Sequence, residues 1–282
     1  MTKAKSMLLY IVLWILAILA GIYLIVIGYL FFNQKQMVYY PYNKLTATPE
    51  DMGIKYENME IKISETETVH GWYIPSSDNS NKHVVLFCHG NAGNISNRLY
   101  TVQLFQTLDI PLLMFDYRGY GISKGEPSEE NSYQDAQLCY KWLIKEKKYK
   151  EENIIVFGRS LGGGVGVELS LREKVKGLIL ESTFTSTGDL GNKLFPIFPI
   201  KWFLKYKYES ISKIKDLGCP VLIIHSSEDD LIPYYMGREL FETATEPKEF
   251  FDIFGGHNDR EYLENPEYID NIKRFITDEI SI

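Results

Sequence analysis

Residues 158–162 read GRSLG and match the pattern G-x-S-x-G, with Ser160 at its centre. A predicted strand over 153–157 comes before the motif, and helical periodicity begins at Leu161. Between a strand and a helix the two glycines allow a sharp turn, which exposes the serine hydroxyl and aims the first helical amide at a developing oxyanion. We therefore expect Ser160 to be a nucleophile and the Leu161 amide to be an oxyanion donor.

His257 is the expected general base for Ser160. It follows the apolar run 250–253 and two glycines, so its imidazole lies on a loop after the last predicted strand. The chain order serine, acid, histidine is the order that a nucleophile on a strand-to-helix turn requires. The other histidines lie within or beside earlier apolar runs and are expected to make structural hydrogen bonds: His70, His83, His89 and His225.

Three acidic residues are candidates for the carboxylate that orients this imidazole. They occupy positions 228–230, directly after the apolar run 220–225. A serine hydrolase needs one carboxylate beside the distal nitrogen of its histidine, because that contact fixes the tautomer of the base. We expect Asp229 to have this role, with Asp230 as the next candidate and Glu228 as the third, and the remaining acids to be solvated.

A second oxyanion donor is expected from the loop after the apolar run 84–88. That loop, residues 89–94, reads HGNAGN. In hydrolases with a G-x-S-x-G turn, an amide from the loop after an earlier strand completes the oxyanion hole. The amide of Asn91 is our candidate, opposite the amide of Leu161.

The rest of the chain alternates between predicted strands and helices. Two segments with period-two alternation, 59–64 and 69–74, predict an antiparallel hairpin, and six short apolar runs predict strands that are covered on both faces. These runs are 84–88, 111–116, 154–157, 177–180, 220–225 and 250–253, and helices are expected at 96–108, 129–147, 161–172, 233–243 and 266–278. The order predicts an α/β fold with a mostly parallel eight-stranded sheet flanked by helices.

The amino-terminal segment is predicted to cross a membrane. Residues 7–32 contain no Asp, Glu, Lys, Arg or His. At about 1.5 Å per residue a helix of this length is about 39 Å long, more than the ~30 Å hydrocarbon core requires. The run also exceeds the apolar core of a cleaved signal peptide, so we expect a retained single-pass anchor. Lys3 and Lys5 precede the helix, which favours a cytoplasmic N-terminus and a catalytic domain on the non-cytoplasmic side.

We divide the chain into three parts. We expect an N-terminal tail and transmembrane anchor at 1–32, a juxtamembrane segment at 33–58, and a catalytic α/β domain at 59–282. The stretch 184–215 is too long for a plain crossover and carries many aromatic residues, so a short lid insertion is expected there.

Composition excludes several other classes of protein. With 30 Lys and Arg against 37 Asp and Glu, the net charge is −7, and no basic stripe is present, so a nucleic-acid partner is not expected. The 3 cysteines lie far apart, which predicts neither a disulfide framework nor a metal site. The nucleotide-binding patterns G-x-x-x-x-G-K-[ST] and G-x-G-x-x-G are not matched. No cofactor and no metal are expected, and no oligomeric state is predicted.

Several motifs together resemble the α/β-hydrolase fold, and within it the membrane-anchored serine hydrolases of the Bem-like group. They are HGNAGN at 89–94, DYRGYG at 116–121, GRSLGG at 158–163, ESTF at 181–184 and GHND at 256–259. The resemblance implies Ser160 as nucleophile, Asp229 as acid and His257 as base, and it implies an esterase, lipase or thioesterase. The chain departs from the family at Ser226, where a glycine is frequent, and at the hairpin turn 65–68.

These observations predict a membrane-anchored serine hydrolase that cleaves ester or thioester bonds through a Ser-His-Asp triad and an acyl-enzyme. Its expected partners are the membrane and a small-molecule or lipid-like acyl substrate. The turn 116–121 is expected to be structural. Two alternatives stay open: a peptidase of the same fold, against which the short basic lid argues, and a non-catalytic membrane scaffold, against which the complete triad argues.

Overall fold

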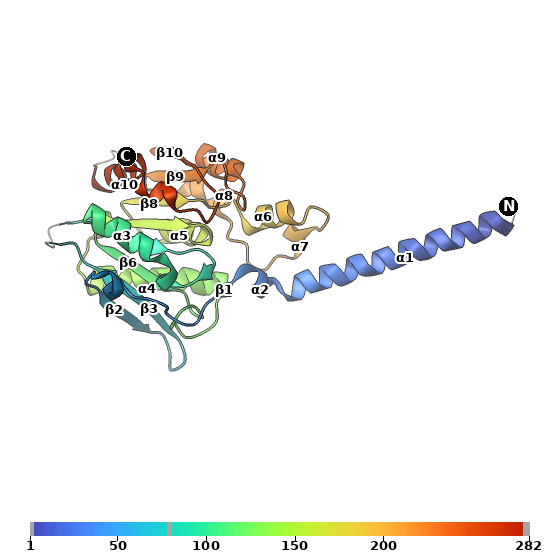
Figure 1. Cartoon of the computed structure of the whole chain (residues 1–282), viewed down its shortest axis with the longest axis horizontal. Coiled ribbons are helices and arrows are strands. Elements are labelled where there is room, and N and C mark those ends of the chain that lie inside the picture. Colours follow the sequence, from blue (N-terminus) through green and yellow to red (C-terminus); the bar gives the residue numbers. More distant parts are fainter. Residues whose placement is uncertain (1–2, 78–80, 279–282) are drawn as a thin grey trace.

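Eight strands form one sheet at the centre of the computed structural model, which describes residues 3–77 and 81–278 (Figure 1). The strands lie in the order β10-β9-β8-β7-β4-β6-β3-β2. Of these strands only β3 runs in the opposite direction to the others, so its pairings with β2 and β6 are antiparallel. The prediction of a mostly parallel eight-stranded sheet is confirmed. The strands are β2 Glu57–Lys62, β3 Thr68–Ile74, β4 Val84–Cys88, β6 Leu112–Asp116, β7 Ile154–Arg159, β8 Gly177–Glu181, β9 Val221–Ser226 and β10 Lys248–Ile253.

The central strands are buried on both faces, as their apolar runs predict. In β4, Val84, Leu86 and Cys88 face one hydrophobic cluster, and Val85 and Phe87 face the other. Because side chains alternate along a strand, one continuous apolar run fills both layers of the core. The burial of these side chains provides the main driving force that holds the sheet and helices together.

Helices cover both faces of this sheet. The first cluster packs under α4 Glu129–Lys145, α5 Leu161–Arg172 and α9 Tyr234–Thr243, and the second under α3 Leu99–Leu108 and α10 Pro266–Thr277. These helices begin or end within a few residues of the predicted positions. Short 3₁₀ turns complete the domain at η1 Pro49–Met52, η2 Ile95–Arg98, η3 Glu151–Asn153, η4 Ile214–Asp216 and η5 Glu261–Glu264.

The amino-terminal helix α1, Lys3–Phe32, extends away from the domain (Figure 1). Within Lys5–Phe32 an 18-residue window reaches a mean hydropathy of 2.8, and this segment makes one helix long and apolar enough to cross a membrane. The following segment is more structured than the sequence indicates. It forms α2, Gln34–Val38, and a two-residue strand β1, Tyr40–Pro41, which pairs in parallel with β5, Ala92–Gly93.

The segment between β8 and β9 forms three short helices. They are α6 Thr187–Leu194, α7 Ile200–Phe203 and α8 Ser210–Lys213. The first two pack together and lie beside the junction of α1 and α2, and the third packs on α5 and α9. We call residues 187–204 the lid.

The turn after β6 is held by buried ionic contacts. Arg118 Nε donates to Asp135 Oδ1 at 2.7 Å, and the Arg118 amide donates to Asp135 Oδ2 at 2.8 Å. Both side chains are buried. The neighbouring Asp116 accepts from the amide of Ile95 at 2.9 Å, which ties this turn to the loop after β4. These contacts fix the turn after β6 against α4 and against the loop after β4.

Replacing Asp135 with Ala is expected to lower the free energy of unfolding by about 3 kcal/mol or more, because it leaves the Arg118 guanidinium buried without its main partner. Denaturant unfolding of the detergent-solubilised chain would measure this change. The control is Glu65→Ala, which removes a carboxylate from the exposed ion pair with Lys62 and should cost less than ~1 kcal/mol. Equal losses in the two variants would contradict a structural role for the buried pair.

Candidate active site

Ser160 lies at a sharp turn between β7 and α5. Its backbone angles are φ 54° and ψ −120°, a region that residues other than glycine rarely adopt. The turn requires glycine on both sides of Ser160, because the backbone packs too closely there to leave room for a side chain. A Cβ on Gly158 would lie 2.3 Å from the Gly162 carbonyl oxygen, and a Cβ on Gly162 would lie 1.9 Å from the Cys88 carbonyl oxygen. The motif 158–162 therefore folds as the sequence predicts.

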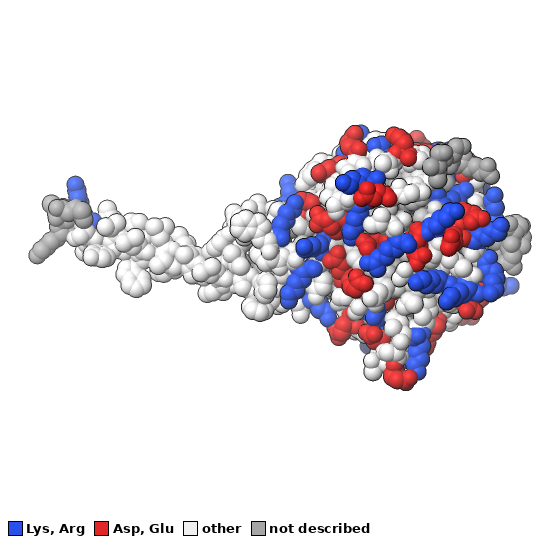
Figure 2. Space-filling model, turned by 180° about the vertical axis from the view of Figure 1, so that it is seen from behind, with Lys and Arg blue, Asp and Glu red and all other residues white. Residues whose placement is uncertain are grey.

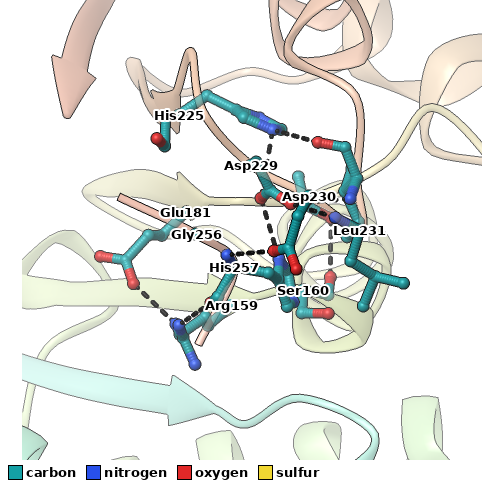
Figure 3. Close-up of polar contacts among 12 residues, drawn as sticks. Arg159, Ser160, Glu181, His225, Asp229, Asp230, Leu231, Gly256 and His257 are labelled. Carbon is teal, nitrogen blue, oxygen red and sulfur yellow. Dashed lines mark hydrogen bonds and ion pairs between the residues drawn. The ribbon is translucent and has the colours of Figure 1, made fainter. Parts of the chain in front are cut away.

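His257 and Asp229 are hydrogen-bonded to one another (Figure 3). The imidazole Nδ1 lies 2.8 Å from Asp229 Oδ2, and the other oxygen of Asp229 accepts from the amides of Leu231 at 3.0 Å and Ile232 at 2.7 Å. Both side chains are almost fully buried. The carboxylate is thus held by the backbone on one side and presented to the imidazole on the other.

The neighbouring acids contact the backbone of the histidine loop instead of its ring. Asp230 Oδ1 accepts from the His257 amide at 2.9 Å, and Glu228 Oε2 accepts from the Gly255 amide at 3.0 Å. The hydroxyl of Ser226 donates to the Gly255 carbonyl oxygen at 2.5 Å. The geometry therefore separates the three candidate acids, since only Asp229 among them has a hydrogen bond to the imidazole.

The surroundings favour an ionised Asp229. Burial alone would raise the pKa of this carboxyl, but the hydrogen bond and charge of His257, together with the two backbone amides, outweigh burial and hold the pKa below its ordinary value. His225 lies beneath this pair, 3.6 Å from Asp229 Oδ2. Burial lowers the pKa of His225, and its Nε2 donates to the Ile232 carbonyl oxygen at 3.0 Å, which is a structural contact.

Arg159 links the serine turn to the histidine loop. Its Nε donates to Glu181 Oε1 at 2.9 Å, and its Nη2 donates to the carbonyl oxygen of His257 at 2.7 Å (Figure 3). Glu181 in turn accepts from the hydroxyls of Tyr262 at 2.8 Å and Tyr268 at 2.5 Å. Arg159 has no role among the expectations from the sequence. Its position immediately before the nucleophile candidate is the signal that could have drawn attention to it.

The loop after β4 passes close to Ser160. A Cβ on Gly90 would lie 3.3 Å from the Ser160 Cβ. The carbonyl oxygen of Asn91 accepts from the Tyr40 amide at 3.0 Å and from the Tyr120 hydroxyl at 2.7 Å. The Asn91 side chain donates to the Val38 carbonyl oxygen at 3.0 Å. Asn91, whose amide is the expected oxyanion donor, is thus held through its carbonyl oxygen and its side chain by the juxtamembrane segment, a contact that leaves no signal in the sequence.

A cavity of about 420 Å³ joins these residues. Ser160, Leu161, His257 and Asn91 line one end of it, so the structure brings four of the five predicted site residues to one cavity and places Asp229 behind the imidazole. The other end is apolar and is lined by the lid and by the amino-terminal segment. Within residues 3–77 and 81–278, no group of three or more His, Cys, Asp or Glu is arranged to hold a metal ion.

Comparison with known proteins agrees with this architecture. A family model described as the alpha/beta hydrolase fold matches residues 83–199. Among solved structures, an esterase of Pyrococcus furiosus superposes with a TM-score of 0.68 at 20% identity, covering 85% of this chain and 97% of that one. An α/β hydrolase from Vibrio vulnificus gives a TM-score of 0.65 at 23% identity, covering 81% of this chain and 83% of that one. At these identities the likeness establishes the fold.

Sequence relatives are closer and cover most of the chain. An uncharacterised protein of Mycobacterium tuberculosis is 32% identical over 94% of both chains. Protein bem46 of Schizosaccharomyces pombe is 31% identical over 84% of both chains. The human alpha/beta hydrolase domain-containing protein 17B is 33% identical over 78% of this chain and 74% of its own. The chain therefore belongs to the α/β-hydrolase family, in the group that contains bem46 and alpha/beta hydrolase domain-containing protein 17B.

Proposed function

We propose that the protein is a membrane-anchored serine hydrolase that cleaves carboxylic ester or thioester bonds. The observation that supports this most directly is the 2.8 Å hydrogen bond between His257 and Asp229, in a cavity that Ser160 also lines. A serine, an imidazole and a buried carboxylate in this arrangement are the groups that acyl transfer needs. The family and its esterase-like structural neighbours support hydrolysis as the general reaction.

In the proposed reaction His257 Nε2 removes the proton from the Ser160 hydroxyl as its oxygen attacks the acyl carbon. The amides of Asn91 and Leu161 donate hydrogen bonds to the oxyanion that forms. Collapse of this intermediate breaks the bond to the leaving alcohol or thiol, which takes the proton from His257. Water then attacks the acyl-enzyme with His257 again as base, and a free carboxylic acid and Ser160 are released.

Asp229 is the proposed acid of the triad. By accepting from Nδ1 it keeps the second ring nitrogen free to take the serine proton, and it stabilises the imidazolium that forms during the reaction. The low pKa of its carboxyl keeps it ionised at neutral pH. Arg159 has a positioning role in this proposal, because it connects the backbone of the His257 loop to β8 through Glu181.

The helix α1 is the proposed membrane anchor. Its length and hydropathy suit a single span. We place its N-terminus in the cytoplasm, because Lys3 and Lys5 precede the apolar run, and therefore the catalytic domain on the non-cytoplasmic side. No nucleic acid, metal or organic cofactor takes part in this proposal.

Labelling of the detergent-solubilised chain by a fluorophosphonate is expected for the natural sequence and not for Ser160→Ala, because the probe reacts only with an activated serine. Ser170→Ala is a matched control, which should label normally. Equal labelling of the natural chain and Ser160→Ala would refute Ser160 as the nucleophile, and no labelling of either would favour a non-catalytic scaffold. Parallel assays with p-nitrophenyl esters, acyl thioesters and aminoacyl amides would distinguish an esterase or thioesterase from a peptidase.

Asp229→Asn is expected to lower kcat for ester hydrolysis by about 10³–10⁴, because the imidazole loses the acceptor that fixes its tautomer. Asp230→Asn should lower kcat less than about tenfold, since its carboxamide oxygen still accepts from the His257 amide. Steady-state kinetics of the two variants on one ester would decide between the acids. A larger loss in Asp230→Asn than in Asp229→Asn would overturn the assignment.

A further inference from the structure

The lid is attached to the membrane-facing helix near its carboxyl end. The hydroxyl of Tyr23 donates to the Ile197 carbonyl oxygen at 2.9 Å, and the Tyr23 ring stacks on Phe198 with 5.1 Å between centroids and 13° between planes. About two turns later, Phe31 meets Phe203 edge to face at 6.2 Å. Contacts at both points make the last third of α1 a support for the lid.

Gln34 fastens this attachment at the start of α2. Its side chain is buried, and its amide nitrogen donates to the carbonyl oxygens of Phe31 and Phe203, each at 3.1 Å. Its side-chain oxygen accepts from the Lys205 amide at 2.7 Å. A buried carboxamide with both groups hydrogen-bonded fixes the two segments in one orientation. Gln34 therefore ties the end of the helix to the lid.

The exposure of α1 changes where the lid begins to cover it. Apart from Gly21, residues 7–25 are exposed, whereas Val26, Ile27 and Leu30 are partly or fully covered. A hydrocarbon core of ~30 Å takes about 20 residues at ~1.5 Å each. Counted from Lys5, that length ends near residue 25. The exposed part of the helix thus has about the length of one bilayer core, and the lid contacts the helix from Tyr23 onward, at the boundary of that core.

The outer surface of the lid suits this boundary. Leu194, Ile197 and Trp202 are 50%, 71% and 90% exposed, although they are large and apolar. Exposed lysines accompany them at Lys193, Lys201, Lys205 and Lys207. Figure 2 shows Lys and Arg side chains along the edge of the domain nearest to the uncharged helix. Aromatic and apolar side chains beside lysines are typical of surfaces that contact lipid headgroups.

The cavity of the candidate active site reaches the same place. Its apolar end is walled by Leu30 and Met37 from the amino-terminal segment and by Phe195 and Phe203 from the lid. Leu194 also lines the cavity and is half exposed, so it forms an apolar rim next to the lid surface. Leu231 and Asn258 also line the cavity, beside the loops that carry Asp229 and His257, and both are exposed.

We propose that residues 194–202 of the lid lie in the headgroup boundary of the bilayer that α1 spans, and that the cavity takes its substrate from that leaflet. The substrate class is then a membrane-resident ester or thioester, whose acyl chain enters past Leu194 while its carbonyl carbon reaches Ser160. The leaving group departs past Asn258, which lines the cavity and is exposed. The reaction part of this inference rests on the proposed hydrolase function, and the placement of the lid does not.

The placement of the lid is tested with the full chain in vesicles of phosphatidylcholine and phosphatidylglycerol. Ile197→Cys is labelled with an environment-sensitive fluorophore, and Leu171→Cys, 41% exposed in the last turn of α5, is the matched control. The three native cysteines are buried. A quencher on the lipid chains should quench the label at position 197 and leave that at 171 unaffected. Equal emission and equal quenching at the two sites would overturn the inference.

The substrate class is tested by comparing a long-chain acyl ester within the vesicles with a short, water-soluble ester. Ile197→Glu should lower the ratio of the two rates about tenfold, because a carboxylate opposes insertion into the interface, and Leu171→Glu should leave the ratio unchanged. Hydrolysis of the soluble ester alone by the natural sequence would overturn the inference while the proposed function stands. Hydrolysis of neither ester would reject the proposed function, and the quenching result would still decide where the lid lies.

Discussion

The strained backbone at Ser160 is the constraint on which the rest of the structure depends. A non-glycine residue at positive φ costs about 1–3 kcal/mol and persists only where its surroundings enforce it. Here the Ser160 amide donates to the Glu181 carbonyl oxygen at 2.9 Å, and the Ser160 carbonyl oxygen accepts from Thr183 Oγ1 at 2.7 Å and from the Gly163 amide at 2.9 Å. The pairing of β7 with β8 brings these partners together, so the sheet register determines where the hydroxyl lies.

The same register organises the second half of the site. Glu181, at the end of β8, supports the serine turn through its backbone and the histidine loop through its carboxylate and Arg159. Two tyrosine hydroxyls complete the shell of that carboxylate. A single strand end thus positions groups that come from segments about a hundred residues apart.

Much of this arrangement is predictable from the sequence because its signals are local. The motif around Ser160, the apolar run before it and the helix after it specify a turn without reference to other segments, and chain order then selects His257. The loop 228–230 limits the acid to three candidates, of which Asp229 is the expected one, and the resemblance implies the same residue. Geometry is needed to see that Asp229 points at the ring and Asp230 at the backbone. The roles of these residues stay predictions until activity is measured.

The contacts that the sequence could not reveal join distant segments through very few residues. A two-residue strand such as β1 has no periodicity, and the pairing of Tyr40 with the loop after β4 leaves no pattern in composition. In the sequence Gln34 is one of several polar residues after the apolar run, and its hydrogen bonds to Phe203 and Lys205 are visible only in the folded chain. Arg159 occupies a variable position of the motif G-x-S-x-G, and its partners Glu181 and His257 are distant in sequence, so its contacts could not be predicted.

The pairing of β1 with β5 links the segment that follows α1 to the loop that faces Ser160. Val38 and Tyr40 hold the Asn91 peptide from the side of the anchor. With α1 as the proposed anchor, a protease that cut the chain between Val38 and Tyr42 would separate the domain from α1 and, in the same event, loosen the loop that faces Ser160. Shedding would therefore yield a poorly assembled enzyme, and a water-soluble form has to keep the chain from Gln34 onward.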